Sequence, residues 1–533
     1  MSSKNQIKIG AILSYVQIIA SVVIGIVYTP IMLRMLGKSE YGLYNIISSV
    51  ASMLALLSLG FNTCYIRYYS KYKKRENPEV EIYKLNGLFL IIFLIIGVVA
   101  LACGLFLRSN LELVFAQGLT AAEYEIARRL MLLVSINLAI SFPMSVFSNI
   151  ISAHERFVFL KSLNVIKTVA SPFLTIPLLL LGFRSVALVF VTLVVSIAID
   201  IVFLFYFKYN LKQKFIFKGF EPGIVRSLFG YTLFIALHMI VDQINWNVDK
   251  LLLGRLRGTE ETAIYSVGFT LYSYYMTIGL PITGMFTPKI HSLVEDTNED
   301  LILRKQYLTE LFVKVGRIQW LILSLVMTGL IFFGKPFIAF WAGDGYERAY
   351  FVCLLLVIPG TIDLIQNMGI EIQRAQNKHR FRSYIYMAMA AINVVLSAWL
   401  CSRYGAVGSA IGTAISLVLV QGIIINIYLH KKCNIDVIAF WKNMLRLSLG
   451  LVIPCVFGVV IVSCFDLYSI GKLILAIALY VLVFCISMWL FGMNNYEKKM
   501  VLKFKGRFIS MRFLRKIRFP LRDRIINSRN RKQ

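Results

Sequence analysis

Four polar residues follow one another along a stretch of the chain that is otherwise apolar. His238, Asp242, Asn245 and Asp249 lie four, three and four residues apart in the segment HMIVDQINWNVDKLLLG. An α-helix turns by about 100° per residue, so this spacing gathers them on one side. A carboxylate at such a position can take up a proton or a Na⁺ ion, and an amide can hold a polar ligand. We therefore predict cation-coupling roles for His238, Asp242 and Asp249.

Further polar residues widen this stripe. Asn247 and Lys250 lie on an adjoining face of the same predicted helix and, with Asn245, are candidate ligand-binding residues. An ionisable group in an apolar helix costs a few kcal/mol, so it usually faces a cavity or a partner. Two alternatives to a water-filled cavity remain. The stripe could form a static hydrogen-bond network with a neighbouring helix, or Asp249 and Lys250 could extend outward to the membrane surface.

A second stripe is predicted about 120 residues later. Asp363, Asn367, Glu371 and Arg374 lie on one side of a predicted helix over 349–373. Asp363 and Asn367 are further candidates for ligand binding. Glu371 and Arg374 lie three residues apart at the helix end, a spacing typical of a solvated ion pair.

Composition indicates that these helices cross a membrane. Hydrophobic residues make up 58% of the 533 residues, charged residues 16%, and the mean hydropathy is +0.73. A soluble domain has about 25% charged residues. Fourteen apolar stretches approach the roughly 20 residues that a spanning helix needs. They are predicted at 9–35, 42–66, 85–107, 126–152, 158–181, 185–207, 227–254, 261–288, 311–333, 349–373, 383–402, 406–430, 447–465 and 471–491.

The distribution of Lys and Arg predicts the orientation. Most of them occupy alternate gaps between the apolar stretches, and cytoplasmic loops collect Lys and Arg. Both termini belong to the basic set, so both are expected inside. The net charge of +29 arises from these loops and from the tail, which argues against a nucleic-acid partner. From Lys498 to Lys532 the tail has fourteen Lys and Arg against one acid, Asp523. It is predicted to bind anionic membrane lipids, with a disordered solubilising tail as the alternative.

The chain also repeats itself. A shift of 221 residues superposes Gly37, Glu40 and Tyr44 on Gly258, Glu261 and Tyr265, and Val186 and Thr192 on Val407 and Thr413. We therefore predict an all-α polytopic membrane protein with fourteen transmembrane helices, both ends inside, and two parallel six-helix lobes. The predicted domains are the first lobe (1–210), a cytoplasmic linker (211–226), the second lobe (227–432), an extra hairpin (433–495) and a basic tail (496–533).

The two lobes differ in charge. The positions equivalent to Asp242 and Asp249 in the first lobe are Ser21 and Tyr28, both uncharged. The first lobe instead has cations toward its cytoplasmic end, Lys167 and Arg67. Such asymmetry suits a ligand with an anionic head and a cation bound elsewhere, so Lys167 and Arg67 are candidate contacts for the anionic head.

Four segments resemble a known family. LGKSEYGLYNI (36–46), NWNVDKLLLG (245–254), RAQNKHRFRSYIYMAMAAINVVLS (374–397) and YGAVGSAIGTAIS (404–416) are similar to the polysaccharide biosynthesis branch of the multidrug/oligosaccharidyl-lipid/polysaccharide exporter superfamily. The resemblance covers the first twelve spans. It implies a flippase in the bacterial cytoplasmic membrane that moves a lipid-linked oligosaccharide on a polyprenyl diphosphate by alternating access. A Na⁺ or H⁺ gradient is the expected driving force, and polysaccharide assembly proteins are further candidate partners.

The first predicted span departs from the family pattern in a way that narrows the choice of transported lipid. Lipid II flippases of the superfamily carry arginines in their first span, whereas Ile9–Leu33 has no charge. Lipid II is therefore not the expected cargo. The alternatives are a multidrug-type antiporter of the same superfamily and a membrane glycosyltransferase or polymerase. The last would need a large extramembrane loop or an acidic metal-binding motif, and the sequence has neither, so we expect no enzyme activity. The eight cysteines and five histidines lack metal-ligand spacing, and no cofactor or metal is expected.

Overall fold

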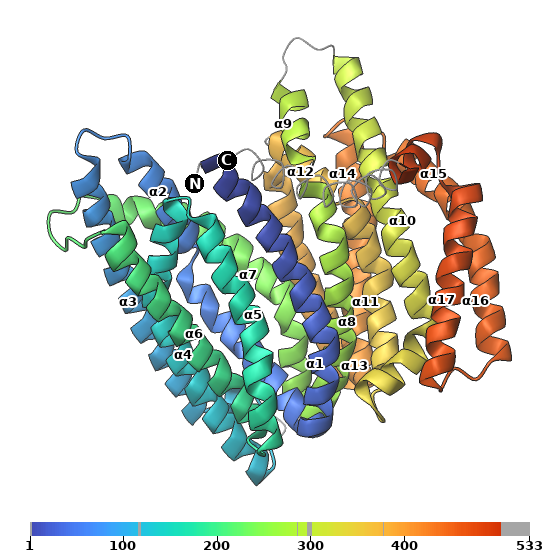
Figure 1. The fold of residues 1–533 in the computed structure, drawn as a ribbon, viewed down its shortest axis with the longest axis horizontal. Coiled ribbons are helices and arrows are strands. Elements are labelled where there is room, and N and C mark those ends of the chain that lie inside the picture. The colour runs from blue at the N-terminus through green and yellow to red at the C-terminus, as the bar shows by residue number, and fades with distance from the viewer. Residues whose placement is uncertain (1–2, 116–118, 285, 296–300, 377, 503–533) are drawn as a thin grey trace, which may run out of the picture. The chain divides into compact units, whose positions relative to one another are not determined.

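The computed structural model describes residues 3–115, 119–284, 286–295, 301–376 and 378–502. Every regular element in these ranges is a helix (Figure 1). Eleven of the described helical runs are long and apolar enough to cross a bilayer. The chain is therefore a multi-pass helical membrane protein. The number of fourteen spans and the cytoplasmic position of both ends stay predictions. Most of the basic tail, 503–533, lies outside the described residues, so its predicted contact with anionic lipids stays a prediction too.

The first half of the chain contains six α-helices and three short helical turns. They are α1 (Ser3–Leu54), η1 (Ala55–Ser58), α2 (Phe61–Tyr72), α3 (Pro78–Ser109), η2 (Leu111–Leu113), α4 (Ala121–Ala153), α5 (Phe157–Leu180), α6 (Arg184–Phe205) and η3 (Tyr206–Leu211).

The second half continues after a non-helical connection. Its elements are α7 (Ile224–Leu256), α8 (Thr259–Gly284), α9 (Thr287–Glu295), α10 (Leu301–Ala342), α11 (Arg348–Ile365), α12 (Met368–Ala375), α13 (His379–Leu417), η4 (Val418–Ile424), α14 (Ile425–Lys431), α15 (Val437–Ser448), η5 (Leu449–Leu451), α16 (Val452–Cys464), α17 (Ile470–Ser487) and η6 (Met488–Gly492).

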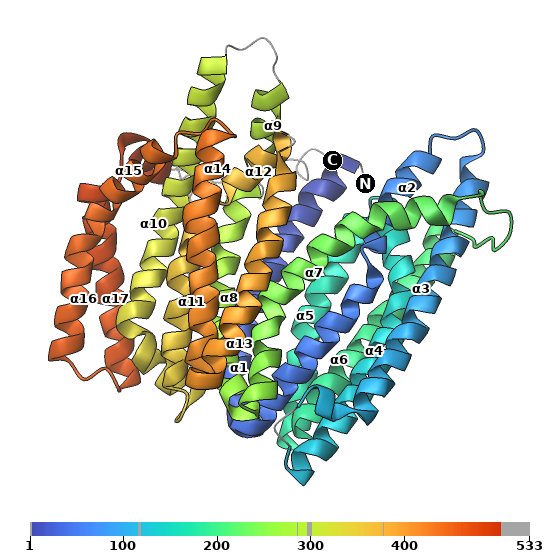
Figure 2. The same cartoon turned by 180° about the vertical axis from the view of Figure 1, so that it is seen from behind.

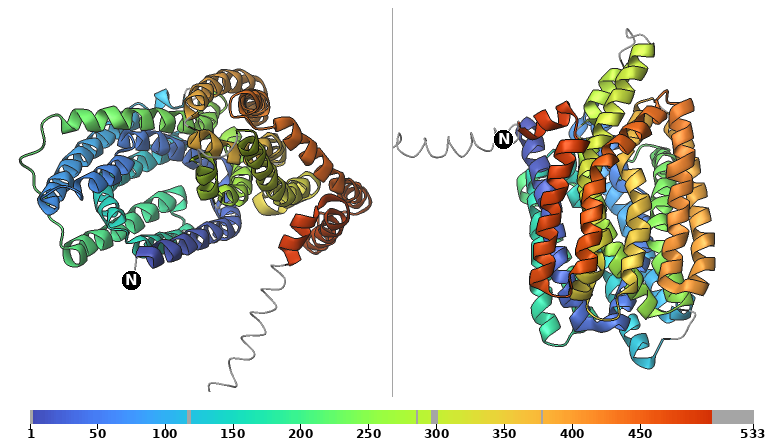
Figure 3. Two further views of the ribbon diagram at one scale, coloured as in Figure 1. Left: turned by 90° about the horizontal axis from the view of Figure 1, so that it is seen from above. Right: turned by 90° about the vertical axis from the view of Figure 1, so that its right-hand side faces the viewer.

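The chain divides into two compact units. Unit 1 comprises Met1–Pro281, Gly334–Leu364 and Gln376–Tyr428. Unit 2 comprises Ile282–Phe333, Ile365–Ala375 and Leu429–Gln533. Within unit 1, α3 packs along α4, α4 along α6, α1 along α5, and α7 along α13 (Figures 1 and 2). Within unit 2, α16 and α17 form an adjacent pair (Figures 1 and 3).

Aromatic rings pack together between α2 and α3 in unit 1. Phe61, Tyr65 and Phe89 are fully buried, and Phe61 and Tyr65 each meet the Phe89 ring edge to face. Such pairs add about 0.5–1.5 kcal/mol to the gain from burial. The Tyr65 hydroxyl donates to Asn86 Oδ1 at 2.7 Å, and Asn86 Nδ2 donates to the Lys214 carbonyl at 3.2 Å. The connection before α7 is thereby attached to α3.

Two long helical runs change direction at glycines that the sequence assigned to turns between spans. Gly37 interrupts α1 with φ 74°, and Gly405 interrupts α13 with φ 60°. A positive φ is strained for a residue with a Cβ, so glycine is the suitable residue at both points. Gly405 also leaves no room for a Cβ, which would lie 2.2 Å from Glu261 Oε2.

The predicted continuous helix over 42–66 is wrong. The run breaks between Leu54 and Phe61, where Leu59 and Gly60 both have positive φ, 46° and 75°. Apolar composition continues through the break, so hydropathy could not reveal it. Gly60 is required because a Cβ there would lie 2.4 Å from Ile235 on α7.

The repeat is reproduced in hydrogen bonds. Glu40 Oε1 accepts from the Ser185 N–H at 2.9 Å, at the start of α6. Glu261 Oε2 accepts from the Ala406 N–H at 2.7 Å, where the second half of α13 starts. Glu40 and Glu261 are 221 residues apart, and so are Ser185 and Ala406, which is the shift found in the sequence. A carboxylate on free N–H groups at a helix start is favourable in each lobe, and the equivalence supports the predicted duplication.

Candidate functional site

Asp249 is the most deeply buried carboxylate of the stripe on α7. Its side chain is 2% exposed and accepts three hydrogen bonds from hydroxyl groups. Tyr265 on α8 donates to Oδ2 at 2.8 Å, and Thr413 on α13 donates to the same oxygen at 2.7 Å. Ser409, one turn before Thr413, donates to Oδ1 at 2.8 Å. A buried charge is tolerated only when it is well hydrogen-bonded, and these donors meet that condition.

The polar cluster continues into the first half of α13. Thr413 Oγ1 lies 3.1 Å from Asn393 Oδ1, and Ser397 Oγ donates to the same amide oxygen at 2.9 Å. The turn at Gly405 brings the two halves of α13 together. They touch at Gly412, where a Cβ would lie 2.7 Å from the Ser397 backbone. Three helices, α7, α8 and α13 with both its halves, therefore supply oxygen atoms to one buried position.

The chemistry of this position is that of oxygen ligands. Ser, Thr and Tyr hydroxyls can donate a proton or offer a lone pair. The donors to Asp249 could therefore turn their lone pairs toward a small cation without moving the backbone. In the described part of the chain no three or more His, Cys, Asp or Glu side chains converge as a metal cluster. One carboxylate among hydroxyl and amide oxygens suits a proton or a hard monovalent cation.

Lys250 packs on an aromatic ring beside this cluster. Its Nζ lies 4.5 Å from the centre of the Phe269 ring, the distance of a cation–π contact. The side chain is half-buried. It therefore adds a positive charge next to Asp249, and its role in ligand binding stays a prediction.

The other residues of the α7 stripe are more open. His238 Nε2 lies 3.7 Å from Asp242 Oδ2, one helical turn away, and both side chains are about half exposed, 55% and 47%. Asn245 Oδ1 is buried and has no hydrogen-bond partner among the described residues. Asn247 Nδ2 donates to Gln243 Oε1 on the same helix. Asn245 therefore has an acceptor that a ligand or water could use, whereas the Asn247 amide is engaged.

Asp363 belongs to a second charged group within unit 1. Arg382 Nη2 lies 3.9 Å from Asp363 Oδ1, and the Arg382 side chain is only 14% exposed. Arg382 also donates to the Tyr386 hydroxyl, which receives a further hydrogen bond from Gln421 Nε2. Asp242 is close enough to Arg382 for electrostatic attraction. Arg382 thus interacts electrostatically with a carboxylate from each predicted stripe, Asp363 and Asp242.

The predicted single face through Asp363 and Asn367 is wrong. Helix α11 ends at Ile365 and α12 begins at Met368, so a turn containing Asn367 separates them. The turn is closed by the Gly369 N–H, which donates to the Gln366 carbonyl at 2.7 Å. Glu371 and Arg374 on α12 form the predicted i,i+3 pair at 2.7 Å, with Arg374 57% exposed. That pair is confirmed.

The cations predicted in the first lobe, Lys167 and Arg67, have their described contacts with residues outside the Asp249 cluster. Lys167 is half-buried on α5 and interacts electrostatically with Asp200 on α6. The Arg67 guanidinium stacks on Tyr231 of α7, 4.1 Å from the ring centre. Arg67 therefore packs on the first turns of α7, well before Asp249 in the chain.

Sequence reasoning missed most partners of these carboxylates. Asn393 and Ser397, and likewise Ser409 and Thr413, are spaced four residues apart on apolar helices. This periodicity was a usable signal, and all four residues lie in the segments that carried the family resemblance. Arg382 lies between the predicted spans 349–373 and 383–402, and the structure places it in the first turn of α13.

Comparisons with known proteins agree with this fold. The family described as polysaccharide biosynthesis protein matches residues 8–293. The structure of the lipid II flippase MurJ in an inward closed conformation is similar with a TM-score of 0.66 and 16% identity, covering 90% of this chain and 97% of that chain. An inward-facing multidrug resistance MATE family transporter of the MOP superfamily has a TM-score of 0.58 and 12% identity, covering 83% and 99%.

A third similar structure is a MOP superfamily transporter from Pyrococcus furiosus, with a TM-score of 0.51, 14% identity and coverage of 82% and 95%. No curated protein gives a significant sequence match. At these identities the structural similarity shows the fold, which is that of MOP superfamily transporters.

Proposed function

The chain belongs to the polysaccharide biosynthesis protein family, and we propose that it flips a polyprenyl-diphosphate-linked oligosaccharide across the bacterial cytoplasmic membrane. Transport proceeds by alternating access and is driven by a Na⁺ or H⁺ gradient. Diphosphate and sugars cannot cross hydrocarbon unaided, because each unpaired polar group costs several kcal/mol there. A transporter must therefore offer polar groups inside the membrane, and α7 has them.

The buried Asp249 cluster is the observation that carries the coupling proposal. Its carboxylate is surrounded by hydroxyl oxygens from α8 and α13. Occupancy of this position by a cation would cancel a buried charge and draw the donors together. A ligand shifts a conformational equilibrium only by its differential affinity for the two states. A cation bound more tightly in one state of the second lobe would supply that bias.

The lipid-linked substrate is proposed to bind to positively charged and amide side chains. Lys250, Lys167 and Arg67 are the proposed contacts for the diphosphate, and Asn245, Asn247 and Asp363 for sugar hydroxyls. The unpaired Asn245 Oδ1 supports this for α7. The diphosphate is expected to favour guanidinium and ammonium groups because charge-assisted hydrogen bonds are about twice as strong as neutral ones.

A flipping assay tests the proposal. Purified full-length protein in proteoliposomes is given a fluorescent polyprenyl-diphosphate oligosaccharide, and a lectin outside reports sugar arriving in the outer leaflet. Flipping should require an imposed Na⁺ or H⁺ gradient. Asp249→Asn should abolish the gradient dependence, and Asp242→Asn tests the neighbouring carboxylate in the same way. The exposed-loop variant Asp466→Asn is the control and should flip normally.

The outcomes separate the candidate functions. Unchanged gradient dependence in both Asp249→Asn and Asp242→Asn would refute the coupling role. A wild-type protein that never flips the lipid, but moves small organic cations such as dyes, would favour the second candidate, a multidrug-type antiporter. That candidate is supported by the shared fold with a MATE family transporter.

A further inference from the structure

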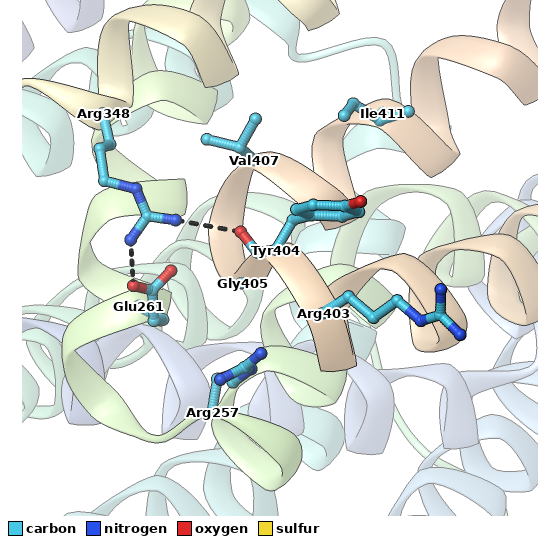
Figure 4. Close-up of a pocket in the computed structure, with 8 residues that line it drawn as sticks. All are labelled: Arg257, Glu261, Arg348, Arg403, Tyr404, Gly405, Val407 and Ile411. Carbon is cyan, nitrogen blue, oxygen red and sulfur yellow. Dashed lines mark hydrogen bonds and ion pairs between the residues drawn. The ribbon is translucent and has the colours of Figure 1, made fainter.

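An open pocket of about 460 Å³ lies where α7 ends and α8 begins. It is lined by the end of α7, the start of α8, the start of α11 and the turn at Gly405 (Figure 4). The sequence predicts this face to be the outer one, where basic residues are sparse. Three arginines nevertheless line the pocket: Arg257, Arg348 and Arg403.

One of the three arginines is neutralised. Arg348 Nη1 donates to Glu261 Oε1 at 2.5 Å, and its Nη2 donates to the Tyr404 carbonyl at 3.0 Å (Figure 4). Glu261 is also bound to the Ala406 N–H at 2.7 Å. The single carboxylate of the pocket is thus committed to Arg348 and to the turn. The charges of Arg257 and Arg403 remain uncompensated by any lining acid.

The two remaining guanidinium groups are held in different ways. Arg257 is exposed, and it donates through Nε to the Cys401 carbonyl at 3.2 Å and through Nη2 to the Ser402 carbonyl. These neutral acceptors orient the group without cancelling its charge. Arg403 stacks on Trp399, 4.8 Å from the ring centre. Within the described chain no protein oxygen accepts from Arg403, so its donors are available.

The surroundings of these charges are apolar. Trp399 and Tyr404 are 55% and 57% exposed, and Val407 and Ile411 line the pocket. Exposed aromatic rings beside arginines are typical of the level of lipid headgroups in a membrane protein. A free anion would not need the apolar wall, whereas a lipid phosphate brings a chain that covers it.

We propose that this pocket binds the phosphate headgroup of a membrane lipid. Arg257 and Arg403 contact the phosphate oxygens, and Trp399 and Tyr404 pack beside the first part of the lipid chain. Two lipids share this chemistry, an anionic phospholipid and a polyprenyl diphosphate. The site stands independently of the proposed transport function, because it rests on the pocket alone.

Lipid binding to the full-length protein tests the site. Native mass spectrometry would measure binding of three probes from detergent micelles: cardiolipin, undecaprenyl diphosphate and zwitterionic phosphatidylcholine. Wild type should bind one or both phosphate-rich lipids and not phosphatidylcholine. Arg403→Gln should weaken that binding about tenfold, because it removes a charged hydrogen-bond donor to the phosphate.

The control and the second variant keep the result interpretable. Arg128→Gln removes another exposed arginine that stacks on an aromatic ring, Tyr124, outside the pocket. It should bind as wild type does. Arg257→Lys is the second variant. It keeps the positive charge but loses the guanidinium donors, so it should bind these lipids more weakly than wild type and more strongly than a neutral substitution would. Preference for cardiolipin identifies a structural lipid, and preference for the diphosphate identifies a site for a polyprenyl carrier. Equal binding of phosphatidylcholine, equal loss in Arg128→Gln, or no loss in Arg403→Gln would overturn the proposal.

Discussion

The backbone of Gly42 lies directly against the carbonyl of Thr259. A Cβ on Gly42 would stand 1.8 Å from the Thr259 oxygen, far closer than any real contact. The Thr259 hydroxyl also donates to Glu123 Oε1 at 3.0 Å, and Ser39 donates to the same oxygen. Two segments that the repeat assigns to different lobes thus meet at one end of the bundle. In the proposed alternating-access cycle, this contact is one that would have to open.

Gly42→Ala is expected to weaken this contact. The methyl group must displace a backbone carbonyl, and overpacking of this kind costs about 1–3 kcal/mol. Hydrogen exchange of the amides over residues 41–47 should be faster than in wild type. Gly230→Ala on α7 is the control, because a Cβ there meets nothing within 4 Å. Equal exchange in Gly42→Ala and wild type would contradict the close approach.

Thr413→Val is expected to change cation affinity at Asp249, in opposite directions for Na⁺ and H⁺. The substitution keeps the shape of the side chain and removes one of three hydroxyl donors to the carboxylate. If the coupling ion is Na⁺, the variant lacks one hydroxyl oxygen that could turn its lone pair to the ion, so the Na⁺ concentration for half-maximal flipping should rise about tenfold. If it is H⁺, loss of a donor to the carboxylate favours the protonated form, so the half-maximal H⁺ concentration should fall. Thr192→Val is the matched control. Thr192 lies 221 residues earlier, and among the described residues its hydroxyl donates to the Leu188 carbonyl of its own helix at 2.7 Å. A similar change in both variants would show that the effect is not specific to Asp249.

Glu497→Gln is expected to destabilise unit 2. Glu497 is 2% exposed, and its two oxygens accept from Arg317 Nε at 2.6 Å and Nη2 at 2.9 Å. Arg317 also donates to the carbonyls of Asn443 and Gly492 at 3.2 and 3.1 Å. Removing one partner of a buried pair leaves an uncompensated charge and costs about 3–5 kcal/mol.

The thermal midpoint of the purified protein measures this effect. Glu125→Gln breaks an exposed i,i+4 pair with Arg129 and is the control, since such pairs contribute little. A Glu497→Gln midpoint as high as that of the control would show that the buried pair is dispensable.

Glu221 is expected to make the connection before α7 sensitive to acid. Arg75 and Tyr72 donate to Glu221 Oε2 at 2.9 and 3.0 Å, and these hydrogen bonds lower the pKa of the Glu221 carboxyl below its usual value. A lowered pKa means that the contact stabilises the fold above the ordinary glutamate pKa. That stabilisation is lost as the pH falls through the lowered value. The effect is small, because the Glu221 side chain is 48% exposed.

Hydrogen exchange over residues 212–223, corrected for the intrinsic rate, checks this prediction between neutral pH and pH 3. Wild type should lose protection as the pH falls. Glu221→Gln should show low protection at every pH. Protection in wild type that does not change over this range would rule out the proposed pH dependence.

Contacts along a single helix could be predicted from the sequence. Spacing of three or four residues was enough to anticipate the Glu371–Arg374 pair and the polar side of α7, because neighbours on one helix are set by its pitch. The repeat could be recognised from the sequence too. Glu40 and Glu261 each accept a hydrogen bond from a backbone N–H at a helix start, and both positions are glutamate.

Breaks in the helices could not be predicted in the same way. The run near Gly60 remains apolar through the break, and hydropathy measures only transfer to the membrane. Near Asn367 the polar residues kept a helical spacing across the break, so periodicity did not reveal it either. The breaks depend on local backbone geometry, such as the positive φ of Leu59 and Gly60. They also depend on the helices that pack against them, such as Ile235 beside Gly60.

The sequence by itself determined that the chain is a multi-pass helical membrane protein with polar residues in one helix, since both depend on composition and helical period. The tertiary structure decided which carboxylate is enclosed. Asp249 is bound by Tyr265, Ser409 and Thr413, which lie 16, 160 and 164 residues away in the chain. Partners at such separations follow from how α7, α8 and α13 pack. Their packing depends on the turn at Gly405 and on small residues such as Gly412, which let the helices approach closely.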